Sequence, residues 1–152
     1  MRLLMLLMAL SCAGFVQAAD ATVKSFERNS LKTIEAAQGA HPYWLVLWDL
    51  DCVYCVQSLK NLAAAQKKNP SLRIVTVATD DVGEREAIAA RLRELGVSSE
   101  AYAFGSASPV EALRYTIDPA WRGEKPRAYF YRGDGQRRAV TGVLDEAIIF
   151  AK

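Results

Sequence analysis

The sequence of 152 residues contains one histidine and three cysteines, and this scarcity excludes several kinds of chemistry. With His41 alone, no mechanism that needs a pair of histidines is available. A structural zinc site takes about four ligands, drawn mainly from cysteine and histidine, and His41 is the only histidine that could join the cysteines. The formal net charge of +2 is too small to indicate binding to nucleic acid or to an acidic membrane surface. The cysteines are therefore the residues whose chemistry has to be explained.

The composition indicates one folded domain. Hydrophobic residues make up 51% of the chain and charged residues 24%, which suits a globular domain with a sizeable core. There is no internal repeat, low-complexity tract or linker to a second domain, so the sequence predicts a single domain over residues 20–152. Basic residues gather between Arg114 and Arg138, and we expect them on turns and exposed strand faces, in contact with solvent rather than nucleic acid.

The first residues have the pattern of a targeting segment rather than of a folded domain. Arg2 provides a positive start, an uncharged stretch follows, and small residues stand at Ala18 and Ala19. This pattern predicts that residues 1–19 are a signal peptide, cleaved after Ala18 or Ala19. An uncleaved anchor also fits, because the uncharged run is near the lower limit of about 17 residues for spanning a bilayer. Lipidation at Cys12 is the third alternative.

Removal of the signal peptide would change the cysteine count. Only Cys52 and Cys55 would remain, in a compartment where disulfides persist. The loss of Arg2 would leave 18 basic and 17 acidic residues, which is close to neutral. The mature chain is thus expected to carry one cysteine pair and almost no net charge.

The cysteine pair stands between a predicted strand and a predicted helix. Residues 43–48 are all apolar, which is typical of a strand buried on both faces in the middle of a parallel sheet. Cys52 and Cys55 follow within a few residues, and helical spacing continues over 56–69. A thiol at the start of a helix lies where backbone N–H groups and the helix dipole favour negative charge. Its pKa is lowered and it becomes a nucleophile, so the pattern predicts a thiol–disulfide redox site.

The spacing of the two cysteines suits disulfide exchange. Helix positions three residues apart are neighbours, so one sulfur can reach the other. We expect Cys52 to attack a substrate disulfide as a thiolate and Cys55 to resolve the mixed disulfide. Two alternatives stay open from the residues alone: an inert structural disulfide, and half of a zinc site.

The rest of the chain alternates between predicted helices and strands. Helices are expected over 25–38, 56–69, 83–95, 109–115 and 144–151, and strands over 43–48, 72–78, 102–104, 128–131 and 137–141. The order α-β-α-β-α in the first part predicts parallel strands joined by helical crossovers. The strand over 102–104 is expected at an edge of the sheet, and the glycine-rich turn over 133–135 predicts a hairpin between the last two strands. The fold class is therefore α/β.

Four features of this layout, spread over most of residues 25–152, match one known family. They are the strand, CxxC and helix with Trp48 four places before the first cysteine, a βα unit after that helix, Lys125-Pro126 entering a strand, and the hairpin followed by Gly142 and a terminal helix. The chain in these respects resembles the thioredoxin-fold redoxins, most closely the exported TlpA-like thiol–disulfide oxidoreductases. The resemblance implies a thioredoxin-like fold with a central mixed β-sheet flanked by helices and a βα insertion after the CxxC helix.

The resemblance also implies a function. It predicts a periplasmic thiol–disulfide oxidoreductase that exchanges a Cys52/Cys55 dithiol with disulfides of exported proteins, with reduction as the favoured direction and no cofactor. The expected partners are thiols and disulfides of exported proteins and a membrane or periplasmic redox protein, but no nucleic acid. An uncleaved N-terminus would tether the domain to the membrane. The alternative is a non-catalytic binding module or chaperone with a thioredoxin-like fold, whose CxxC is a structural disulfide.

Further site residues follow from the same resemblance. Pro126 is expected to form a cis peptide bond in a loop that packs against the CxxC. The backbone of Lys125 would then present N–H and C=O groups to an extended substrate peptide, in a short β-augmentation. Trp121 lies in the loop before this proline and is a candidate to line the peptide groove.

The chain departs from the family around the cysteines. Asp51 stands where the family usually has tryptophan, and Val46 stands where thioredoxin has a buried aspartate. The dipeptide between the cysteines is Val53-Tyr54, which is atypical and leaves the direction of electron flow and the partner open. Negative charge at Asp49 or Asp51 would raise the pKa of a nearby thiol, against the effect of the helix start. These two aspartates are therefore candidate residues for tuning the pKa of the cysteine.

Overall fold

The structure is a computed structural model that describes residues 22–151. The predicted signal peptide, with its alternatives of an anchor or a lipidated cysteine, lies outside the described residues. Within 22–151, no helix has the length and apolar character needed to cross a bilayer. The strands are β1 (Lys24–Phe26), β2 (Tyr43–Trp48), β3 (Arg73–Asp81), β4 (Glu100–Phe104), β5 (Arg127–Tyr131) and β6 (Arg137–Thr141). The helices are α1 (Ser30–Gln38), α2 (Val53–Lys68), α3 (Arg85–Leu95), α4 (Val110–Ile117) and α5 (Glu146–Phe150), with a 3₁₀ turn over Val82–Glu84.

The strands form one mixed sheet in the order β1-β4-β3-β2-β5-β6. β2 pairs with β3 in parallel, and α2 forms the crossover between them, as the sequence predicts. On its other side β2 pairs antiparallel with β5, which continues through the hairpin into β6. The predicted βα unit after the CxxC helix is present, because α3 leads from β3 to β4 and widens the sheet by one strand. The predicted α/β class with a central mixed sheet is confirmed.

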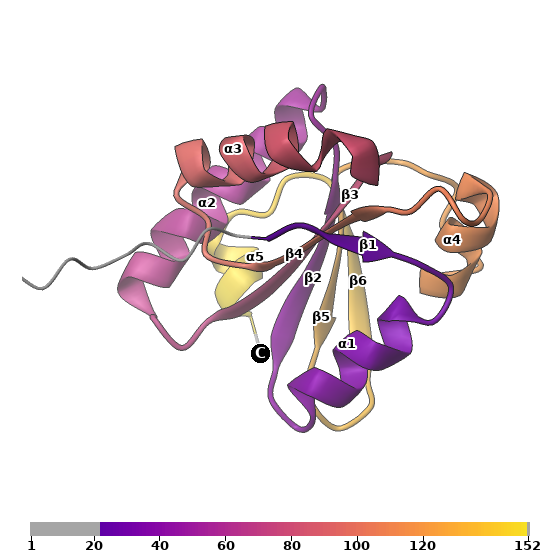
Figure 1. The fold of residues 1–152 in the computed structure, drawn as a ribbon. Helices are drawn as coiled ribbons and strands as arrows, with labels where there is room; N and C mark the ends of the chain where they lie inside the picture. The colour runs from indigo at the N-terminus through magenta and orange to yellow at the C-terminus, as the bar shows by residue number, and fades with distance from the viewer. Residues whose placement is uncertain (1–21, 152) are drawn as a thin grey trace, which may run out of the picture.

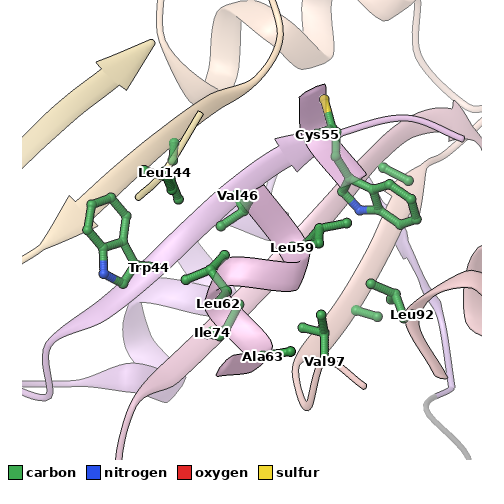
Figure 2. Close-up of a cluster of buried hydrophobic side chains, with 14 of the residues drawn as sticks. Trp44, Val46, Cys55, Leu59, Leu62, Ala63, Ile74, Leu92, Val97 and Leu144 are labelled. Atoms are coloured by element: carbon green, nitrogen blue, oxygen red, sulfur yellow. The ribbon is translucent and has the colours of Figure 1, made fainter. Parts of the chain in front are cut away.

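Helices cover both faces of the sheet, which explains the unbroken apolar run of β2. Alternate residues Trp44, Val46 and Trp48 face the core formed with α2, α3 and α5. The residues between them pack in a second core with α1 and α4. Figure 1 shows the sheet between these two groups of helices, and Figure 2 shows Cys55 and Leu59 of α2 in the first core. All six residues of β2 are buried, so the strand is a rigid base for the cysteine loop at its end.

Two predictions about elements are wrong at the far edge of the sheet. The helix expected over 25–38 starts only at Ser30, because Lys24–Phe26 pairs with β4 as a short edge strand. As a result β4 lies between β1 and β3 and is not itself an edge. Three residues are too few to show the period-2 alternation that identifies a strand in a sequence, although the Phe26 side chain is completely buried.

Candidate functional site

The two cysteines lie at the N-terminus of α2, at the end of the central strand. Cys52 is the N-cap residue, and its sulfur accepts a hydrogen bond of 3.2 Å from the backbone N–H of Cys55. The two sulfurs form a disulfide, with 5.2 Å between the Cα atoms. Cys52 is partly exposed, whereas Cys55 has an exposed fraction of 1% and packs in the first core. The outer sulfur can therefore be reached from solvent, and the inner sulfur is shielded behind it.

The loop between β2 and α2 is held by backbone hydrogen bonds. The N–H of Cys52 donates to the carbonyl of Asp49 at 3.4 Å, and the carbonyl of Cys52 accepts from the N–H of Val56 at 3.1 Å. The helix therefore starts at Val53, three residues before the predicted start. The cysteine itself caps the helix, so both residues of the intervening dipeptide belong to the first turn. The sulfur of Cys52 thus lies among the free N–H groups of a helix start, where negative charge is stabilised.

The strand pairing brings the loop of Pro126 to the same end of the sheet. Leu47 of β2 is the register partner of Arg127 in β5. Because the strands are antiparallel, the residues that follow this pair toward the cysteine loop are Trp48 on β2 and Pro126 before β5. The Lys125–Pro126 peptide bond is cis, which is the isomer that the resemblance implies, and Pro126 is buried. Its carbonyl accepts a hydrogen bond of 3.0 Å from the N–H of Gly142.

The side chain of Lys125 connects this loop to the base of the cysteine loop. Its ammonium donates to the Oδ2 of Asp49 and, at 2.9 Å, to the Oγ1 of Thr79 at the end of β3. The Lys125 and Asp49 side chains have exposed fractions of 23% and 21%, so this ion pair is partly shielded from water. Asp49 is one of the two aspartates expected to tune the pKa of the cysteine thiol. In the structure its charge is paired with that of Lys125. Nothing in the sequence spacing indicates this contact, because the two residues are 76 positions apart.

A second carboxylate near the loop belongs to Asp80, near the end of β3. Its Oδ2 accepts a hydrogen bond of 3.1 Å from the N–H of Leu50 and so supports the cysteine loop. Burial raises the pKa of the Asp80 carboxyl above its ordinary value of 3.8, and the charge of Asp49 acts in the same direction. The bond from Leu50 lowers the pKa and offsets part of this shift. The ionised form of Asp80 is therefore less favourable in the folded protein than in the unfolded chain.

We expect Asp80→Asn to stabilise the oxidised protein at neutral pH. A folded-state pKa above the unfolded value means that this group favours folding at low pH, and that the benefit is lost as the pH rises through the folded pKa. At about pH 7 the carboxylate costs stability, whereas asparagine carries no charge and keeps an oxygen for the Leu50 N–H. Urea unfolding should give a higher free energy of unfolding for Asp80→Asn at about pH 7, and a smaller difference at about pH 4.

The matched control is Asp134→Asn. Asp134 is exposed in the 133–135 turn and also accepts a backbone hydrogen bond, from Gln136 at 2.9 Å. The difference in free energy of unfolding between Asp134→Asn and the wild type should not change with pH in this way. A lower stability of Asp80→Asn at neutral pH would show that the charge of Asp80 supports the loop rather than opposing folding.

The surface around Cys52 is apolar with one acidic residue. Val53 and Tyr54 have exposed fractions of 77% and 68%, which are high values for large apolar side chains. Asp51 is also exposed and lies next to the cysteine in the chain. An exposed apolar rim of this kind fits contact with another polypeptide.

The aromatic residue proposed for the peptide groove is part of the core. Trp121 has an exposed fraction of 4% and packs in the second core with Leu113 and Ile117 of α4. Its indole N–H donates to the carbonyl of Glu124 at 2.8 Å, so its one polar group is satisfied inside the protein. The prediction that Trp121 lines a peptide groove is corrected, because a buried indole offers almost no surface to a peptide. Trp44 and Trp48 are completely buried, as expected for core residues.

Other features of the structure lie away from the cysteines or give no site. A cavity of about 530 Å³ is found at the opposite end of β2, where Pro42, Leu72, Phe130, Ile149 and Phe150 are among its lining residues. Within residues 22–151, no group of three or more His, Cys, Asp or Glu side chains is arranged to hold a metal ion. The Cys52–Cys55 disulfide, at the exposed start of α2, is a group that can undergo thiol–disulfide exchange.

Comparison with known proteins gives matches among solved structures only. No protein-family model and no curated protein matches the chain. A secreted disulfide oxidoreductase of Mycobacterium tuberculosis, described as homologous to E. coli DsbE, superposes with a TM-score of 0.52 at 22% identity, over 72% of this chain and 75% of that chain. MTB DsbF, in mixed oxidised and reduced forms, superposes with a TM-score of 0.54 at 16% identity, over 72% of this chain and 75% of that chain. A thioredoxin-related protein from Neisseria meningitidis serogroup B superposes with a TM-score of 0.54 at 19% identity, over 71% of this chain and 78% of that chain.

These likenesses concern the fold over about 70% of the chain. At such low identities they establish the fold and no more. The chain has a thioredoxin-like fold, with the CxxC at the start of the helix that follows the central strand.

Proposed function

We propose that this chain is an exported thiol–disulfide oxidoreductase that uses Cys52 and Cys55 to reduce disulfides of other exported proteins in the periplasm. One observation carries the proposal. Cys52 caps α2 and is partly exposed, while Cys55 is buried directly behind it and bonded to it. An inert structural disulfide has no need of a sulfur that faces solvent among the free N–H groups of a helix start.

The proposed reaction proceeds in two exchanges. The Cys52 thiolate attacks one sulfur of the substrate disulfide, a mixed disulfide forms, and the other substrate sulfur leaves as a thiolate and takes a proton. Cys55, after losing its proton, attacks the Cys52 sulfur, which re-forms the protein disulfide and releases the second substrate thiol. Two electrons pass to the substrate. A dithiol redox partner, in the membrane or the periplasm, must then reduce the Cys52–Cys55 disulfide again.

The surroundings of the disulfide support a polypeptide as the substrate. The apolar side chains of Val53 and Tyr54 are exposed beside Cys52. The loop of Lys125 and Pro126 lies at the same end of the sheet, and the Lys125 backbone is the proposed contact for an extended peptide. Export is supported by the targeting pattern of residues 1–19 and by the secreted state of one structural neighbour. An uncleaved first segment would act as a membrane tether.

The test of this function is insulin reduction with a small dithiol as the electron source. We expect residues 20–152 to accelerate the reduction well above the rate with the dithiol alone. No acceleration would favour the alternative of a binding module whose CxxC is only structural.

The direction of electron flow is tested by the reduction potential of the Cys52–Cys55 pair. A reductant should have a value toward the thioredoxin end, about −270 mV, whereas an oxidant lies near about −120 mV. Equilibration with glutathione and dithiothreitol buffers gives this value directly. A potential at the oxidising end would reverse the proposed direction while leaving the exchange chemistry in place.

We expect Asp51→Ala to lower the pKa of the Cys52 thiol in the reduced protein. The exposed carboxylate adjoins the cysteine in the chain and disfavours the thiolate. Because water screens an exposed charge, the shift should be a few tenths of a unit, roughly the effect of a surface interaction. The ultraviolet absorbance of the thiolate, followed against pH, measures it. Asp134→Ala, in the hairpin turn, is the control; an unchanged or higher pKa in Asp51→Ala would reject this role.

A further inference from the structure

We propose that Lys125 is a positioning residue that sets the reactivity of Cys52 by neutralising Asp49 at the base of the cysteine loop. The inference rests on the proposed function and names a determinant of its rate. The residue acts through its side chain, in addition to the backbone contact with substrate proposed above.

The contacts place the ammonium of Lys125 where three segments meet. Asp49 is the first residue after β2, Thr79 lies near the end of β3, and Lys125 itself precedes β5. The ammonium is bonded to the Asp49 carboxylate and, at 2.9 Å, to the Thr79 hydroxyl. About three-quarters or more of each charged side chain is covered, since the exposed fractions are 23% and 21%. Charges so shielded interact more strongly than surface pairs, because less water screens them.

The charge state of Asp49 matters because this residue belongs to the cysteine loop. Its backbone carbonyl accepts the N–H of Cys52, so only one tight turn separates the carboxylate-bearing residue from the nucleophile. An unpaired carboxylate there would oppose the stabilisation of a thiolate by the helix start. The ammonium of Lys125 offsets this charge. The opposing effect of Asp49 on the thiolate is then smaller than that of an unpaired carboxylate.

This arrangement predicts opposite effects for the two single substitutions. Lys125→Met leaves the carboxylate unpaired and should raise the Cys52 pKa by about one unit, a common effect of one nearby charge. Asp49→Asn leaves the ammonium uncompensated and should lower that pKa. The double variant Lys125→Met/Asp49→Asn should return close to the wild-type value, which gives a double-mutant cycle. If the pair only tied the loops together, both single variants would loosen the same contact and shift the pKa in the same direction.

The rate of exchange provides a second readout. At a pH below the Cys52 pKa, a rise of about one unit lowers the thiolate fraction about tenfold. The more basic thiolate is a better nucleophile, with a Brønsted coefficient of about 0.5, which recovers about threefold. Attack on a small disulfide such as that of Ellman's reagent should therefore be about threefold slower in reduced Lys125→Met. Reduced Asp49→Asn should react faster under the same conditions.

The matched control is Lys68→Met. Lys68 lies in the last turn of α2 and pairs with Glu146 at 2.7 Å, but the two side chains are 60% and 62% exposed. The same substitution in this surface pair should leave the Cys52 pKa and the rate unchanged.

Two results would overturn the inference: a Cys52 pKa in Lys125→Met that is unchanged or lower, or shifts in the same direction for both single variants. These results are independent of the proposed function, because the thiolate titration can be read in any reduced form of the folded protein. Failure of the wild type to reduce insulin would instead reject the function and leave the electrostatic result standing.

Discussion

Cys52→Ser should abolish insulin reduction, leaving only the rate of the small dithiol alone. Serine has nearly the same size, but its hydroxyl cannot form the mixed disulfide on which the exchange depends. Cys55 remains in this variant, but it is 1% exposed and cannot take over the attack. The loss of activity should therefore be complete. Circular dichroism should show that the variant is folded, so unfolding does not account for the loss. Residual turnover well above the dithiol rate would mean that Cys52 is not the nucleophile.

Cys55→Ser is the matched variant, because it should lose turnover by a different route. Cys52 can still attack, but no second sulfur is present to release the substrate, so the mixed disulfide accumulates. Mass spectrometry of the protein after mixing with a disulfide peptide should detect this adduct in Cys55→Ser and not in Cys52→Ser. The opposite pattern would assign the attack to Cys55 and would contradict the burial of its sulfur.

The sequence was most informative about the part of the fold that places the cysteines. The run over 43–48 is apolar without interruption, and such a pattern arises when helices cover both faces of a strand. The structure shows that arrangement, with the CxxC directly after the strand. The start of α2 was misplaced by three residues because cysteine is not a common N-cap residue. The capping contact is made by sulfur and becomes apparent only with coordinates.

The charged contacts around the cysteines could not be predicted, because they depend on side chains from distant segments. The pairing of Lys125 with Asp49 and the bond from Leu50 to Asp80 each join separate strands and loops. A sequence shows that aspartates flank the cysteines, but it does not show which of them is neutralised. That difference decides whether such a residue disfavours the thiolate.

The expectation that the basic residues face solvent is wrong for part of the C-terminal sheet. Arg127 forms an ion pair with Asp118 at 3.0 Å, and each side chain has an exposed fraction of 14%. The hydroxyl of Tyr129 donates to the same carboxylate at 2.8 Å, and burial of this tyrosine raises its pKa to about 12. Burial alone would raise the pKa of Asp118, but its hydrogen bonds with Ala120, Tyr129 and Arg127 lower it overall. This network connects α4 to β5, next to the loop of Pro126.

Leu59→Ala should lower the free energy of unfolding of the oxidised protein by about 2–5 kcal/mol, the usual cost of removing a large side chain from a core. Leu59 is completely buried in the first core, about one helical turn beyond Cys55. Its side chain anchors α2 on the sheet, so the truncation leaves a cavity between the helix and β2. Urea unfolding followed by tryptophan fluorescence measures the loss, because Trp44 and Trp48 lie in the same core.

Gln57→Ala, on the exposed side of the same helix, separates packing from helix propensity. Its side chain is exposed and donates to Asn61 at 2.9 Å, so we expect a change within about 0.5 kcal/mol. The reduction potential of Leu59→Ala should stay close to the wild-type value at a temperature where the variant is folded. The first turn of α2 is held by its own backbone bonds and by the loop contacts, which this truncation leaves in place. A large change in potential with little loss of stability would instead mean that packing beneath the helix tunes the disulfide directly.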